Sequence, residues 1–72
     1  MFCFTGFIVS DHRKQPRKIL ERVAEFFEID LTIVTILPIY YDIYSVKITF
    51  IAKAKNEQLY TDFMQAVRTL IS

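Results

Sequence analysis

Basic side chains gather in the segment SDHRKQPRK, residues 10–18, at a point where a helix is expected to begin. Pro16 is typical of the first helical turn, where a proline loses no hydrogen bond. Backbone N–H groups at a helix start bind phosphate and carboxylate groups, and neighbouring cations strengthen such a site. The segment holds four of the nine Lys and Arg residues of the chain, namely Arg13, Lys14, Arg17 and Lys18. It is therefore a candidate site for a small anion.

The same segment is also consistent with an ordinary solvated loop, in which Asp11 or Ser10 caps the start of the helix. His12 is the only histidine and Cys3 the only cysteine, so the usual zinc and iron–sulfur ligand sets are excluded. These two residues lie at opposite ends of an expected strand and suggest no pair of nucleophile and base. We expect no catalytic residue, no metal site and no cofactor, and hence no enzyme activity.

Aromatic side chains supply a second set of candidate contacts. They make up 15% of the chain, and tyrosine is enriched at the energetic centres of protein interfaces. The segment PIYYDIY, residues 38–44, is expected to be a turn or a hairpin tip. Its tyrosines either anchor a partner or fold back on the sheet, and the sequence leaves both alternatives open. The interface residues that we expect are Phe2, Phe4, Phe7, Tyr40, Tyr41 and Tyr44.

Length and composition favour association with another chain. Seventy-two residues form one small domain, 1–72, which buries only about 60% of its unfolded surface. No disulfide can form within the chain, while 53% of the residues are hydrophobic. Part of this apolar surface is therefore expected to meet a second subunit. Cys3 itself is expected to be a small core residue.

The net charge and the length of the apolar stretches also limit the classes of partner and the cellular location that we expect. The net charge of +1 supplies no overall field that would attract nucleic acid. No apolar stretch reaches the roughly 20 residues that a membrane span requires, and no secretion signal is recognisable at the start. We therefore expect a cytoplasmic protein with no membrane partner, and nucleic acid is disfavoured as a partner.

Hydrophobic periodicity predicts three strands and two helices. Residues 1–9 alternate as a strand with two apolar faces, so we expect cover on both sides. Gly6 within this strand suggests a bulge or a close backbone approach. Asn56 is a good cap for the second helix. The full order is strand 1–9, helix 16–28, strand 31–37, strand 44–53 and a final helix that follows residue 56.

This order predicts an α+β fold. A right-handed crossover followed by a hairpin places the third strand between the first and the second, with both helices on one face. The result is a ferredoxin-like βαββα two-layer sandwich that lacks its last strand, with strand order 1-3-2. The first strand is then an exposed apolar edge, which is an aggregation hazard unless it is paired. We expect a twofold dimer, in which either the first strands pair or the open sheet faces stack.

A helix-and-strand pattern that follows Asp11 and Pro16 covers most of the chain. It consists of ILERVAEFFEIDLTIVTI (19–36) and VKITFIAKAKNEQLYTDFMQAVRTL (46–70). The pattern resembles that of ACT-type regulatory domains. The resemblance implies a regulatory domain that binds an amino-acid effector, often at a subunit interface.

Two positions depart from the family pattern, because Arg17 and Glu28 stand where the family has glycines. Those glycines let the backbone approach the effector, so an anion held here would be gripped by side chains. The candidate ligand-binding residues are Asp11, Arg13, Lys14, Arg17, Lys18 and Asp30.

The function that we expect is a small, non-catalytic regulatory or interaction module of ACT-like type. It would assemble as a homo-oligomer and bind a small anionic effector such as an amino acid. Two alternatives remain open. One is a nucleic-acid-associated module that uses the basic loop 12–18, and the other is a protein-binding adaptor that uses the tyrosine-rich hairpin 38–44.

Overall fold

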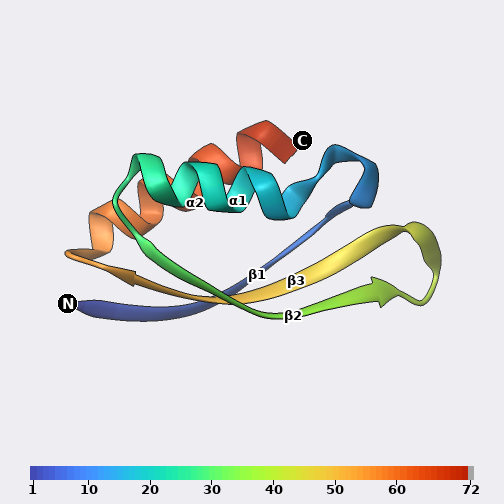
Figure 1. Ribbon diagram of the computed structural model, residues 1–72, viewed down its shortest axis with the longest axis horizontal. Coiled ribbons are helices and arrows are strands. Elements are labelled where there is room, and N and C mark those ends of the chain that lie inside the picture. The colour runs from blue at the N-terminus through green and yellow to red at the C-terminus, as the bar shows by residue number, and fades with distance from the viewer. Residues whose placement is uncertain (72) are drawn as a thin grey trace.

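The computed structural model describes residues 1–71 and has three strands and two helices, all joined by short connections. The strands form one antiparallel sheet in the order β1-β3-β2, and Figure 1 shows both helices over the same face of it. This is the predicted ferredoxin-like plan without its last strand. The elements are β1 (Phe2–Asp11), a 3-10 turn η1 (His12–Lys14), α1 (Pro16–Phe26), β2 (Asp30–Ile39), β3 (Asp42–Ala54) and α2 (Glu57–Ile71).

The core lies between the helices and the helix-facing side of the sheet. Strand β3 alternates as expected, and its buried side chains Ile48, Phe50 and Ala52 point toward the helices. The ring of Phe50 meets Phe63 of α2 edge-on, with ring centroids 6.1 Å apart. Leu20 of α1 is fully buried in the same cluster. Among residues 1–71, no helix is long and apolar enough to cross a membrane.

The two helices begin in different ways. Asn56 caps α2 as predicted, since its Oδ1 accepts the N–H of Leu59 at 2.9 Å. The predicted cap of α1 by Asp11 or Ser10 is wrong. Asp11 instead caps η1, whose single turn intervenes, and α1 starts after Gln15, which has a left-handed φ of 54°.

The sheet has one covered face and one open face. Side chains alternate along a strand, and in β1 the odd-numbered ones point away from both helices. Cys3, Phe7 and Val9 are consequently exposed. The predictions that Cys3 is a core residue and that this strand is covered on both sides are therefore wrong for the chain by itself. We call this uncovered side of the sheet the open face.

Gly6 marks a close approach and not a bulge. Strand β1 pairs with β3 in unbroken register from Phe2 to Asp11. A Cβ added at Gly6 would lie 2.5 Å from the hydroxyl oxygen of Tyr60 and 3.0 Å from Cζ of Phe50. The position therefore has room for glycine alone, which is one of the two alternatives that the sequence suggested.

Candidate functional site

The basic segment and the tyrosine hairpin, predicted as separate sites, meet at Tyr44. The Arg13 guanidinium lies over the Tyr44 ring, 4.3 Å from its centroid. The ring of His12 also stacks near Tyr44, with centroids 6.4 Å apart. The contact depends on β3 running back beside the end of β1, where Asp11 pairs with Ser45. Nothing in the local sequence of either segment indicates it.

A double hydrogen bond fixes Arg13 in this position. Its Nη2 donates to Oδ2 of Asp11 at 2.6 Å, and its Nε donates to Oδ1 at 3.0 Å. The side-chain and backbone hydrogen bonds from Arg13 lower the pKa of Asp11 to about 2. Asp11 in turn raises the pKa of Arg13. This arginine therefore stays charged and already has an anion bound to it.

Two more of the basic side chains have partners within the chain. Lys14 donates its Nζ to the carbonyl oxygen of Ile71 at 3.0 Å, which places a cation at the negative end of α2. The Nε of Arg17 donates to Glu21 at 3.1 Å, one helical turn away. Three of the four predicted basic side chains thus bind the chain itself. These contacts favour an ordinary loop over a site in which all four basic side chains bind one small anion.

Asp30 is not part of this cluster. It begins β2 opposite Lys53, whereas Asp11 ends β1 opposite Ser45. The two aspartates are separated by eight positions along β3, from Ser45 to Lys53, which is about 26 Å at about 3.3 Å per residue. Strands β1 and β2 are parallel to each other, so the end of one lies far from the start of the next. One chain therefore does not bring together the ligand set that the resemblance implies.

A pocket of about 350 Å³ lies between the start of α1 and the sheet. Its floor is apolar, and basic side chains stand at its rim. The residues that line it are His12, Gln15, Pro16, Arg17, Lys18, Ile36, Val46 and Ile48. We call it the basic-rimmed pocket. The sequence indicated its rim but not its floor, because Ile36, Val46 and Ile48 come from two strands distant in the chain.

The predicted aromatic interface residues fall into two groups. Phe4 is half-buried and its ring stacks on Tyr60 of α2, with centroids 4.2 Å apart, while Tyr44 is held by Arg13. Every member of the set except Phe4 is exposed. Tyr40 at the hairpin turn is 98% exposed, so its ring does not fold back on the sheet. The exposed members of the set are Phe2, Phe7, Tyr40, Tyr41 and Tyr44.

The open face carries a further apolar surface, formed by residues of both edge strands. Val9 of β1 and Leu37 of β2 flank the same residue of β3, Lys47, and both are about half exposed. The Nζ of Lys47 lies 4.6 Å from the centroid of the Phe7 ring. The alternation of β1 hinted at this surface, since both of its faces are apolar. Exposed apolar patches of this kind mark contact surfaces.

No chemistry-bearing cluster accompanies these surfaces in the described part of the chain. Among residues 1–71, no group of three His, Cys, Asp or Glu side chains could hold a metal ion. Comparisons of this chain with protein-family models, with curated proteins and with solved structures found no match. The features of this chain that indicate a function are therefore its exposed surfaces.

Proposed function

We propose that this chain is a non-catalytic module that associates with a second copy of itself through its sheet. The observation that carries the proposal is the open face, where Phe7 is 57% exposed, Leu37 55% and Val9 47%. Burial of apolar surface contributes about 25 cal/mol per Å², so covering this face would add stability that a domain of this size lacks.

The total accessible surface supports the same proposal. It is 5067 Å², whereas a compact monomer of 8.5 kDa is expected to expose roughly 4,700 Å². The difference is surface that a partner would cover on association. The resemblance to ACT-type domains supports a regulatory role for the assembly. The exposed thiol of Cys3 fits a reducing compartment such as the cytoplasm.

Sedimentation equilibrium or size-exclusion chromatography with light scattering tests self-association. We expect a dimer at micromolar concentration, and we expect Phe7→Ser to weaken it about tenfold, because the change removes one exposed ring from each sheet. The matched control is Tyr40→Ser, which removes an even more exposed ring at the hairpin turn, away from the sheet face. A chain that stays monomeric up to millimolar concentration would contradict the proposal.

A second candidate function is binding of a small amphipathic anion, such as an amino acid, in the basic-rimmed pocket. The observation that favours it is the combination of an apolar floor with Lys18 and His12 at the rim. A carboxylate would meet the rim while an apolar side chain covers the floor.

Thermal-shift measurements with the amino acids test this second function. A ligand at 100 times its Kd adds about 2.7 kcal/mol of stability, and Lys18→Gln should reduce the shift. Arg22→Gln is the control, since Arg22 lies on the same helix but does not line the pocket. No shift with any amino acid would exclude this ligand class.

A further inference from the structure

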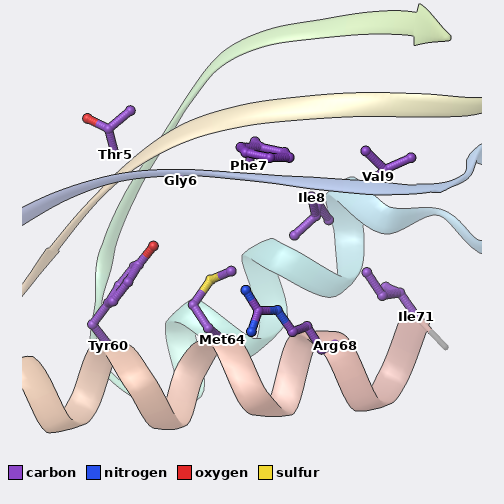
Figure 2. A pocket seen from close by; sticks show the side chains of 9 residues that line it. All are labelled: Thr5, Gly6, Phe7, Ile8, Val9, Tyr60, Met64, Arg68 and Ile71. Atoms are coloured by element: carbon purple, nitrogen blue, oxygen red, sulfur yellow. The ribbon is translucent and has the colours of Figure 1, made fainter.

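A groove of about 450 Å³ runs between the free edge of β1 and helix α2. Figure 2 shows its two walls, with the side chains of α2 rising toward the strand and the Tyr60 ring reaching toward Gly6. Ile8 points down toward the helix, whereas Thr5, Phe7 and Val9 point away from it. The residues of the helical wall are Tyr60, Met64, Arg68 and Ile71.

The groove has the position that one more strand would occupy. Among residues 1–71, β1 has β3 as its one sheet neighbour, so about half of its backbone N–H and C=O groups point into the groove. A strand paired there would lie about 4.8 Å from β1. Its helix-facing side chains would then cover Met64 and Ile71. Its backbone would form hydrogen bonds with the unpaired N–H and C=O groups of β1.

The two edges of the sheet differ in whether they carry features that prevent pairing with another strand. The β2 edge contains Pro38 and two register shifts, one after Ile33 and one after Pro38. Prolines and bulges are features that block edge-to-edge association. The β1 edge has ten residues in unbroken register and carries no proline, and its first charge is Asp11 at the end. One edge is thus protected and the other is left open.

We infer that β1 pairs antiparallel with β1 of a second copy, which gives a six-stranded sheet with four helices on one face. The inference rests on the proposed function. It adds which edge of the sheet associates, which strand of the second copy pairs with it, and in which direction that strand runs. A second copy supplies a strand that carries no charge from Phe2 to Ser10 and whose Phe4 and Ile8 face the helices, as the groove requires. The net charge of +1 adds little repulsion between copies.

Twofold pairing also explains why assembly would stop at two chains. It uses both open β1 edges at once and leaves the protected β2 edges at the outside. The open faces of the two copies then become continuous across the new strand pair. Phe7, at the middle of the groove-lining segment from Thr5 to Val9, would lie near the twofold axis.

A matched pair of lysine substitutions separates edge pairing from stacking of open faces. Val9 and Leu37 both flank Lys47, one on each edge strand, and are similarly exposed. We expect Val9→Lys to weaken the dimer about tenfold, because it sets a charge beside the new strand pair in both copies. Leu37→Lys should leave the dissociation constant nearly unchanged. Sedimentation equilibrium measures both, and circular dichroism verifies that each variant is folded.

The outcomes distinguish this inference from the proposed function. Equal weakening by both lysines means that the open faces stack, which overturns the edge inference but leaves self-association through the sheet intact. A dimer that neither lysine weakens overturns the inference and places the interface outside the sheet. A wild-type chain that is monomeric overturns the proposed function itself.

A distance measurement tests the antiparallel arrangement directly. The single cysteine, Cys3, is exposed and accepts a spin label without further mutation. Antiparallel pairing centred on Phe7 places the two copies of Cys3 eight positions apart along the strands, about 27 Å. Pulsed electron resonance should give a distribution near this value. A distance below about 15 Å would exclude the arrangement.

Discussion

Glu28 occupies a backbone conformation that glycine favours. Its φ is 56°, and it follows the last turn of α1. The N–H of Ile29 donates to the carbonyl of Ala24 at 2.8 Å, and the N–H of Glu28 donates to Glu25 at 3.1 Å. These two bonds define a Schellman cap, in which the left-handed residue is usually glycine. The turn therefore has the geometry of a glycine cap, although residue 28 is a glutamate and carries a Cβ.

We predict that Glu28→Gly stabilises the chain by about 1 kcal/mol, because it removes the strain of a left-handed L-residue. The pair between Glu28 and Lys55 is exposed and 4.0 Å long, so its loss costs little. The control Glu25→Gly, inside the exposed side of α1, should destabilise by about 1 kcal/mol. Urea unfolding measures both. A loss of stability in both variants would contradict the prediction.

Because of its contact with Arg13, we expect the Asp11 carboxyl group to titrate at a lower pH than an ordinary aspartate. The pKa of Asp11 is lowered from 3.8 to about 2 by hydrogen bonds from Arg13. Since the folded pKa is the lower one, the contact stabilises the fold above pH 3.8 and is lost as the pH falls toward 2. We expect Arg13→Gln to move the pKa of Asp11 back toward its ordinary value in a carboxyl NMR titration. Arg17→Gln should leave it unchanged, and identical midpoints in all three proteins would refute the assignment.

At the scale of elements, the contact between β1 and α2 depends on the missing side chain at Gly6. Tyr60 stacks on Phe4 and directs its hydroxyl under the strand. Burial raises the pKa of Tyr60, which agrees with a ring held against the sheet. The Tyr60 hydroxyl can lie this close to the edge strand only where the strand carries no Cβ.

We predict that Gly6→Ala destabilises the chain by about 1–3 kcal/mol, since an added methyl group overpacks the contact. Combining it with Tyr60→Phe should recover part of the loss, because the nearest clashing atom is the Tyr60 hydroxyl oxygen. A double-mutant cycle by thermal unfolding gives the coupling. Purely additive effects of the two substitutions would show that the clash is relieved elsewhere.

At the scale of the whole molecule, exposed apolar side chains are spread over several surfaces. The open face is one, the hairpin turn with Tyr40 and Tyr41 is a second, and Phe26 beside Leu70 on the helices is a third. Of these, the sheet also offers an unprotected edge with a groove beside it. This combination is why we assign self-association to the sheet.

We predict that the unfolding temperature rises with chain concentration. Association stabilises the folded state by mass action, about 1.4 kcal/mol for each tenfold rise in concentration. For a dimer of this total size the shift is about 3–6 °C per tenfold. Scanning calorimetry over a hundredfold range measures it, and Val9→Lys should flatten the dependence. An unfolding temperature that does not change with concentration would argue for a monomer.

The amino-acid sequence by itself determined the kinds of element, their order, the strand order and the Asn56 cap. The elements, their order and the cap depend on periodicity, turn residues and local capping, which act over a few residues. The strand order follows from the right-handed crossover and the hairpin that connect these elements. The basic segment was recognisable for the same reason, since its charge is local. The face of β3 that is buried was also predictable, because Lys47 and Lys53 mark its wet side.

Only the tertiary structure decided which side chains and segments of the chain contact one another. Both faces of β1 are apolar, so alternation could not tell that Cys3 lies on the open face. The partners of the basic segment come from far along the chain, as when Lys14 binds the carbonyl of Ile71, 57 residues away. The groove beside β1 likewise exists only once α2 is folded over the sheet. Contacts between distant segments follow from how the elements pack, and no local pattern encodes them.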